Sequence, residues 1–159
     1  MAVGEANLGE LLPVAGLRLA TVSAGIKKPG RRDVVLMGLA PGSHVAGVFT
    51  RNAFCAAPVV VARAHLAASQ QQPAFLLVNT GNANAGTGEP GLADARRCAA
   101  AVAELSGVPS EAVLPFSTGV IGEPLPVQKI VDVLPQALAE LREDGWLDAA
   151  HGIMTTDTR

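Results

Sequence analysis

Residues 74–107 read AFLLVNTGNANAGTGEPGLADARRCAAAVAELSG, and they combine a short apolar run with a longer helical repeat of apolar residues. The run Ala74–Val78 is continuously apolar, which is typical of a strand covered on both faces. From Leu92 to Leu105 the apolar residues recur at helical spacing, until a Ser-Gly pair ends the pattern. A buried strand followed by an amphipathic helix indicates a layered α/β fold, and we expect this strand to be central in its sheet.

The segments on either side of this stretch alternate between β-rich runs and helical patterns. Short β-rich runs bounded by glycine, proline or charged turns predict strands in the first half and one more after the central helix. The predicted strands are Leu17–Ala24, Asp33–Leu39, His44–Thr50, Ala57–Ala62 and Ala112–Phe116. A β meander followed by alternating strands and helices predicts an α/β protein with a layered mixed sheet and covering helices.

Two further helices are predicted in the last third of the chain. Apolar residues from Val127 to Leu141 trace a helical stripe, which we expect Pro135 to break or kink. A last helical stretch covers Trp146–Ile153 and leads into polar threonines. No repeat or interdomain linker interrupts the chain, so we expect residues 1–159 to form a single domain. Its polar ending, without a closing strand, predicts that this domain is incomplete.

The composition argues against several classes of function. The 12 Lys and Arg residues against 14 Asp and Glu give a net charge of −2, and no basic stripe with interleaved aromatic residues suggests nucleic-acid binding. No apolar run approaches the roughly 18 residues of a membrane span. Glu5 and Glu10 precede the first basic residue, whereas a signal peptide begins with positively charged residues. We therefore expect a soluble, cytoplasmic protein.

The two cysteines, Cys55 and Cys98, have neither CxxC spacing nor histidines at the spacing of a zinc site. A disulfide framework and a metal site both lack support. We expect two buried free thiols in a reducing cytosol.

The loop that follows the buried strand, Asn79–Gly88, is rich in asparagine and glycine. Such a loop can adopt positive φ and present several amides to a ligand. It can equally be a long turn that caps itself through its own side chains. Both interpretations remain open at this point.

Within the same region Gly86, Gly88 and Gly91 match G-x-G-x-x-G between a strand and a helix, so a small dinucleotide-binding domain is an alternative. The true fingerprint turns tightly from its strand, whereas the residues from 79 to 85 intervene here. Pro90 also removes an N–H group that could bind phosphate. The pattern therefore favours a nucleotide site only weakly.

The segment Pro115–Glu123 is a strand end that opens into a turn of small residues. A hydroxyl beside a glycine N–H at such a turn can hold a developing oxyanion. The alternative is a turn with a Ser or Thr helix cap. Ser117 as a hydrolase nucleophile is disfavoured because G-x-S-x-G is absent.

The last candidate segment is Thr155-Thr156-Asp157-Thr158, whose hydroxyls and carboxylate could bind the polar ends of an amino acid. A capping turn after a helix would have the same composition.

Several short motifs, taken together and in order, resemble the ornithine acetyltransferase family. They are Gly25-Ile26-Lys27-Lys28, Gly47-Val48-Phe49-Thr50-Arg51-Asn52, Ala56-Ala57-Pro58-Val59 and residues 79–88, 117–123 and 154–158. The resemblance runs from about Leu17 to Arg159. It implies the N-terminal part of the α chain and an N-terminal-nucleophile-like fold, present here in part.

The resemblance implies a chemistry as well. In this family a precursor cleaves itself before a threonine, whose hydroxyl attacks the acetyl group of N-acetylornithine and then passes it to glutamate in arginine biosynthesis. The two chains stay together, with an α2β2 heterotetramer expected. Thr118, by its hydroxyl, and Gly119, by its N–H, are implied to form the oxyanion hole, and Thr155, with Thr156 beside it, to bind substrate. No cofactor is implied, although some members use acetyl-CoA as acetyl donor.

This sequence departs from the family pattern in two places. Thr80 and Gly86 stand where relatives usually have Ser and Cys. In the family a substrate-binding lysine and the nucleophilic threonine follow the Thr-Thr-Asp-Thr motif, and residues 1–159 do not contain that segment. We therefore expect this chain to supply the oxyanion hole and part of the substrate pocket, and to be inactive alone. A non-catalytic assembly or binding subunit is the alternative.

Overall fold

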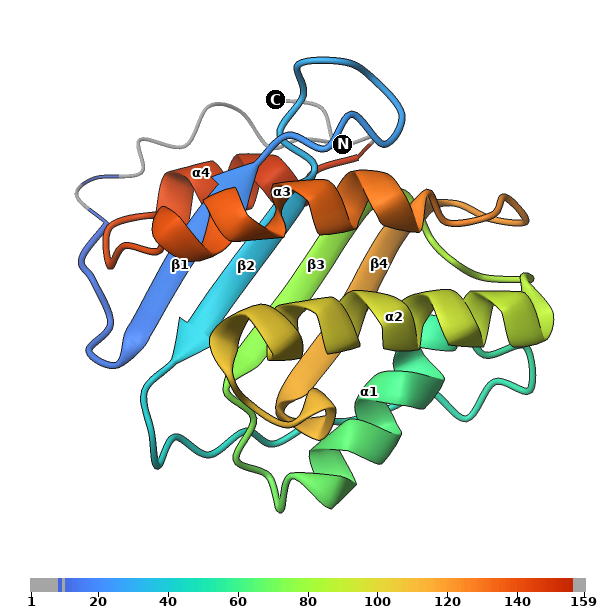
Figure 1. The fold of residues 1–159 in the computed structure, drawn as a ribbon, viewed down its shortest axis with the longest axis horizontal. Coiled ribbons are helices and arrows are strands. Elements are labelled where there is room, and N and C mark those ends of the chain that lie inside the picture. Colours follow the sequence, from blue (N-terminus) through green and yellow to red (C-terminus); the bar gives the residue numbers. More distant parts are fainter. Residues whose placement is uncertain (1–8, 10, 156–159) are drawn as a thin grey trace.

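A four-stranded mixed sheet forms the centre of the computed structural model, which describes residue 9 and residues 11–155 (Figure 1). Its strands are β1 (Leu17–Val22), β2 (Val34–Leu39), β3 (Phe75–Asn82) and β4 (Val113–Val120). They lie in the order β1-β2-β3-β4; the first two pairings are antiparallel and the β3–β4 pairing is parallel. The predicted mixed sheet is confirmed, and β3 is an interior strand as expected.

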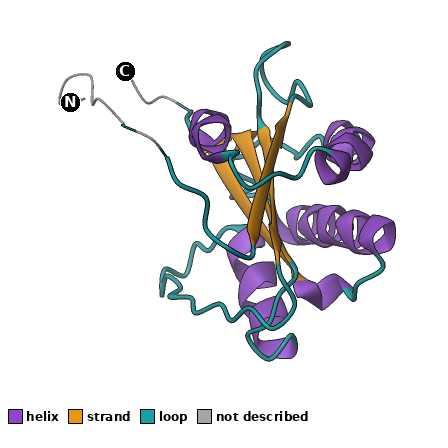
Figure 2. Ribbon diagram, turned by 90° about the vertical axis from the view of Figure 1, so that its left-hand side faces the viewer, coloured by secondary structure: helices purple, strands orange, loops and turns teal. Residues whose placement is uncertain are grey.

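Helices cover both faces of this sheet (Figure 2). They are α1 (Ala57–Ala68), α2 (Gly88–Ser106), α3 (Val127–Ala139) and α4 (Trp146–Ile153), with a short 3₁₀ helix, η1, at Ser110–Ala112. Helices α2 and α3 pack on one face, where Ala99 and Leu134 meet Leu77 in the main core. On the other face α4 packs through Ala149 against β1 and β2, and α1 packs through Leu66 against β4. Layered α/β architecture is therefore confirmed.

The central helix α2 ends where the sequence predicts. Gly107 adopts the left-handed conformation with φ +72°, and its N–H donates to the carbonyl of Ala103 at 2.9 Å. Glycine reaches this conformation without the steric cost that a Cβ imposes, which makes it the usual residue after a helix. The chain can then turn back through η1 into β4. Among the described residues no helix is long and apolar enough to cross a membrane.

Two predicted strands differ from the structure. Ala57–Ala62 is the start of helix α1 rather than a strand, and His44–Thr50 contains no strand. Valines at positions 59 to 61 favour a strand locally, but Pro58 suits the first turn of a helix, and burial of Val61 stabilises the helical form. The first half is consequently a hairpin followed by a helix, not a meander.

Pro135 does not break its helix, because α3 continues to Ala139. Proline in a helix removes one backbone hydrogen bond and crowds the preceding turn. Its neighbours Leu134 and Ala137 are fully buried against the sheet, and this packing offsets the cost.

The two cysteines lie in different surroundings. Cys98 is buried, and burial raises the pKa of its thiol to about 12, so it stays protonated and unreactive at neutral pH. Cys55 is only partly buried, so the expectation of two buried thiols is wrong for this residue.

Candidate active site

The parallel strands β3 and β4 end side by side, and a cavity of about 440 Å³ lies at this end. Thr80 pairs in register with Thr118, and Gly81 with Gly119. The cavity is lined by Lys27, Lys28, Arg31, Asp33, Thr80, Gly81, Thr118, Gly119, Val120 and Thr155. The structure thus brings Thr118, Gly119 and Thr155 together from separate segments. Thr156 lies outside the described residues.

Gly119 lets the two strand ends approach closely. Its φ is +139°, and a Cβ at this position would lie 2.3 Å from the carbonyl carbon of Gly81 and 2.5 Å from the nitrogen of Asn82. A side chain would therefore collide with the backbone of β3, which has no flexible end to move aside. The glycine is required both by its conformation and by the space around it.

Two asparagine side chains at the end of β3 hold the end of β4 and the loop beyond it. Asn79 accepts a 2.6 Å hydrogen bond at Oδ1 from the Ser117 hydroxyl. Asn82 donates from Nδ2 to the carbonyls of Glu123 and Pro124, at 3.2 and 3.0 Å. Both asparagines are buried, where unpaired amides would be costly. These bonds fix the segment on either side of Thr118.

Asn84 closes the loop onto helix α2. Its side chain is completely buried; Nδ2 donates to the carbonyl of Gly91 at 2.9 Å, and Oδ1 accepts from the Thr87 hydroxyl at 2.8 Å. The asparagine-rich loop is therefore a turn that caps itself, and these amides are engaged within the chain. The asparagine amides thus agree with the self-capping interpretation, while Thr80 and Gly81 of the same segment line the cavity.

The same packing argues against a dinucleotide site. A Cβ on Gly91 would lie 1.9 Å from Thr87 Oγ1 and 2.5 Å from Asn84 Oδ1, so this glycine makes room for the loop's own side chains. In the dinucleotide fingerprint the glycines instead clear space for a pyrophosphate and for helix–strand packing. The loop has the glycines of the pattern, but Gly91 accommodates the side chains of Thr87 and Asn84 instead of a phosphate.

We expect Asn84→Ala to lower the free energy of unfolding by about 2–3 kcal/mol, because it removes a completely buried side chain and leaves the Thr87 hydroxyl without its acceptor. Urea unfolding monitored by circular dichroism measures this change. The matched control is Asn52→Ala, which removes an exposed side chain that accepts from the backbone N–H of Phe54. A similar loss in both variants would contradict the role given to Asn84.

One wall of the cavity is the loop between β1 and β2. Asp33 is 2% exposed and accepts at its two carboxylate oxygens from the backbone N–H groups of Ala24 and Ile26, at 2.7 and 2.6 Å. This buried carboxylate shapes the loop so that Lys27 and Lys28 lie at the cavity. Sequence reasoning missed Asp33, since its position before β2 gave no sign of the bonds back to the loop.

The cavity carries an excess of positive charge. Lys27, Lys28 and Arg31 line it together with one carboxylate, Asp33, whose oxygens are occupied by backbone N–H groups. Lys27 Nζ lies 4.0 Å from the carboxylate of Glu123, and both side chains are exposed. Such a pair is weak in water, so it leaves the cation available to other anions. The electrostatics of the cavity suit a ligand that bears a carboxylate.

A second wall of the cavity contains Thr155, which follows helix α4. Close packing holds this helix on the sheet, because a Cβ on Gly152 would lie 2.6 Å from Thr21 Cγ2 and 2.7 Å from Val35 Cγ2. Threonine and valine side chains are stiff, so little could move to admit it. The glycine therefore allows α4 to lie directly on β1 and β2.

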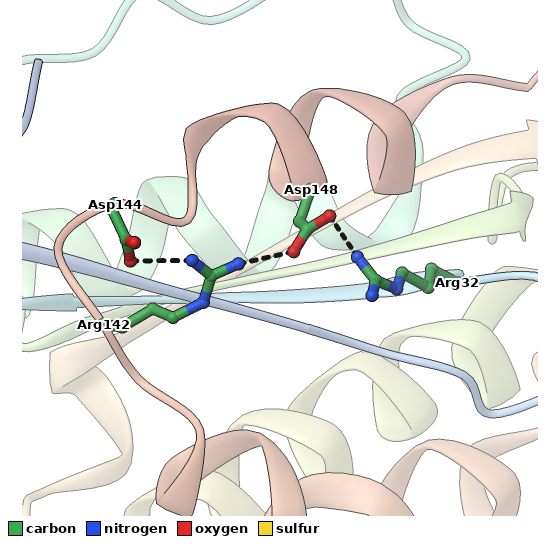
Figure 3. A network of polar contacts seen from close by, with 4 residues as sticks. All are labelled: Arg32, Arg142, Asp144 and Asp148. Atoms are coloured by element: carbon green, nitrogen blue, oxygen red, sulfur yellow. Dashed lines mark hydrogen bonds and ion pairs between the residues drawn. The ribbon is translucent and has the colours of Figure 1, made fainter. Parts of the chain in front are cut away.

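Ion pairs fix the beginning of the same helix (Figure 3). Asp148 pairs with both Arg32, from the loop between β1 and β2, and Arg142, which also pairs with Asp144 at 2.7 Å. The hydrogen bond from Arg142 lowers the pKa of Asp144. The network is exposed, so we expect a small contribution to stability.

Comparison with known proteins identifies relatives over nearly the whole chain. A model of the ArgJ family matches residues 18–159. The chain is 61% identical over 158 residues to the "Arginine biosynthesis bifunctional protein ArgJ" of Pseudomonas fluorescens (strain Pf0-1), and equally to that of Pseudomonas syringae pv. tomato. Each alignment covers 99% of this chain but 38% of the relative, so the chain spans well under half the length of these relatives.

Two solved structures share the fold. An ornithine acetyltransferase from Mycobacterium tuberculosis, complexed with ornithine, superimposes with a TM-score of 0.85 at 37% identity, covering 92% of this chain and 79% of that one. The ArgJ protein of Bacillus halodurans gives 0.81 at 33% identity, covering 91% and 75%. The predicted ornithine acetyltransferase fold is confirmed. On the match of residues 18–159, together with this shared fold, the chain belongs to the ArgJ family.

Proposed function

We propose that this chain supplies the oxyanion hole and part of the substrate pocket of an enzyme that transfers an acetyl group from N-acetylornithine to glutamate in arginine biosynthesis. The observation that carries the proposal is the single cavity shared by Thr118, Gly119 and Thr155. Its positive charge suits substrates that bear carboxylates. Membership of the ArgJ family supports the same reaction.

The proposed chemistry is a double displacement. A threonine hydroxyl from outside residues 1–159 attacks the acetyl carbonyl, and its proton passes to that threonine's own α-amine. The resulting oxyanion accepts hydrogen bonds from the Thr118 hydroxyl and the Gly119 N–H. Collapse breaks the bond to nitrogen as the protonated α-amine returns its proton to that nitrogen, which releases ornithine and leaves the acetyl group on the threonine. The neutral amine of glutamate then attacks this ester through the same oxyanion hole and loses a proton to the α-amine. The ester C–O bond breaks as this proton passes to the threonine oxygen, which releases N-acetylglutamate and the free hydroxyl.

The proposal extends to partners and donors. We propose that the chain works with a β chain of the same precursor in an α2β2 heterotetramer in the cytoplasm. N-acetylornithine and glutamate are the substrates, and acetyl-CoA is an alternative acetyl donor. No bound cofactor is required, since the reaction passes through an ester on the protein.

We expect residues 1–159 alone to show no acetyl transfer from N-acetylornithine to glutamate above the uncatalysed rate. Thr118 cannot replace the nucleophile, because it lies within a strand and has no free α-amine. The assay follows ornithine release by the purified chain, first alone and then co-expressed with the remaining segment that the relatives carry.

The control is the same remaining segment expressed without residues 1–159. Activity that appears only when both parts are present supports the proposal. Robust activity from residues 1–159 alone would overturn the assignment of the nucleophile. No activity from the combined parts would instead favour a non-catalytic assembly subunit.

A further inference from the structure

Arg31 connects the two walls of the cavity. Its guanidinium donates from Nη1 to the carbonyl of Thr155 at 3.3 Å and from Nη2 to the carbonyl of Met154. Its own carbonyl accepts a 2.6 Å hydrogen bond from the hydroxyl of Ser23. One partly buried side chain thus joins the loop between β1 and β2 to a segment more than 120 residues further along the chain.

The segment that Arg31 holds has left its helix. Helix α4 ends at Ile153, and Met154 is extended with φ −66° and ψ +141°. Backbone carbonyls just past a helix end have no partner within the helix and need donors from elsewhere. The planar guanidinium offers two parallel N–H groups and can bind two neighbouring carbonyls at once. An ammonium group lacks this fixed fork.

Two further contacts, at Asp148 and Gly152, hold the helix itself. Asp148, which Arg32 and Arg142 bind, lies in the first turn of the helix, and Gly152 packs in its last turn. Thr155 comes after both. Because Arg31 binds the backbone carbonyls of Met154 and Thr155 directly, it is placed to hold the Thr155 side chain near the oxyanion hole.

We propose that Arg31 is a positioning residue, which fixes Thr155 against the cavity and so maintains binding of the acetylated amino acid. This inference rests on the proposed function, in which Thr155 contacts substrate. Arg31 acts on Thr155 through the backbone, so its loss weakens binding in the ground state and the transition state alike. Such uniform binding affects KM rather than kcat.

The first test uses the complete enzyme, in which this chain is joined by the remaining segment of the relatives. We expect Arg31→Ala to raise KM for N-acetylornithine about tenfold or more, the usual effect of losing a hydrogen bond to a charged donor, with kcat nearly unchanged. Arg31→Lys should recover part of this loss. Millimolar ethylguanidine should lower the KM of Arg31→Ala, because it replaces the missing group.

The matched control is Arg32→Ala, which removes the same charge from the adjacent position and, among the described residues, an exposed ion pair with Asp148. Its KM should stay within about twofold of the parent enzyme. An equal rise in both variants would show that charge alone matters and would overturn the role of Arg31.

A double-mutant cycle separates an effect through Thr155 from direct contact with substrate. Thr155→Val should raise KM by itself, and adding Arg31→Ala to it should cause little further change, because both substitutions remove the same contribution. Additive effects would overturn the proposal, since Arg31 would then act independently of Thr155.

Amide hydrogen exchange of the 159-residue chain without substrate gives a test that does not depend on activity. We expect residues 150–155 to exchange faster in Arg31→Ala than in the parent chain, and Arg32→Ala to leave residues 154 and 155 unchanged. Unaltered exchange in Arg31→Ala would overturn the inference. If the complete enzyme shows no acetyl transfer, the proposed function is wrong. The hydrogen-exchange result still decides separately whether Arg31 holds this segment.

Discussion

Thr118→Val is expected to reduce the turnover of the complete enzyme by about 10²–10³-fold, the usual effect of removing one donor from an oxyanion hole. Valine keeps the shape of threonine but cannot donate to the negative charge that develops on the carbonyl oxygen. Because this charge is absent from the bound substrate, KM should change little. Steady-state kinetics of ornithine release measures both parameters.

The control for this substitution is Thr21→Val, which makes the same change on β1 at a buried hydroxyl without a hydrogen-bond partner among the described residues. Exchanging an unpaired buried hydroxyl for a methyl group should be nearly neutral. Unchanged turnover in a folded Thr118→Val enzyme would remove Thr118 from the mechanism.

Gly119→Ala should destabilise the folded chain more than Thr118→Val does. The new Cβ would overlap the backbone of Gly81 and Asn82, at a φ of +139° that alanine rarely adopts. Strain and overlap together should lower the free energy of unfolding by about 2–5 kcal/mol. The strand ends must separate to admit the methyl group, so the oxyanion hole should also lose its geometry. Thermal unfolding and the rate of acetyl transfer give the two measurements.

Gly122→Ala provides the matched control for this second substitution. Gly122 also has positive φ, +80°, but a Cβ there meets nothing within 4 Å. Gly122→Ala should therefore lower the free energy of unfolding only by the conformational strain, about 1–2 kcal/mol. If Gly119→Ala is no worse than Gly122→Ala, then the close approach of β3 and β4 is not what requires glycine at position 119.

The sequence was most informative where local pattern and tertiary environment agree. The apolar run of β3 and the helical spacing of α2 predict both elements, because a strand and a helix in the interior must be apolar on the faces they bury. Helix α1 was missed because its valines favour a strand locally, whereas burial of Val61 and Leu66 against neighbouring elements decides the outcome.

The residues of the candidate site could likewise be predicted only in part. Thr118, Gly119 and Thr155 were identified through resemblance to a family, and the structure places them in one cavity. Asp33 and Arg31 carry no local signature. Their roles depend on bonds to backbone groups that only the folded chain brings near, in the case of Arg31 across more than 120 residues. Short-range pattern cannot reveal such contacts.

The parallel pairing of β3 with β4 also has a consequence for the order of folding. The hydrogen bond between Ser117 and Asn79 spans 38 residues, and helix α2 must complete the crossover before these strand ends can meet. Pairing across such a distance pays the entropy of closing a long loop and is slow compared with hairpin formation. The hairpin of β1 and β2 can form early, whereas the oxyanion hole cannot exist before the crossover closes. A spectroscopic probe at position 118 would therefore report a late step in the refolding of this chain.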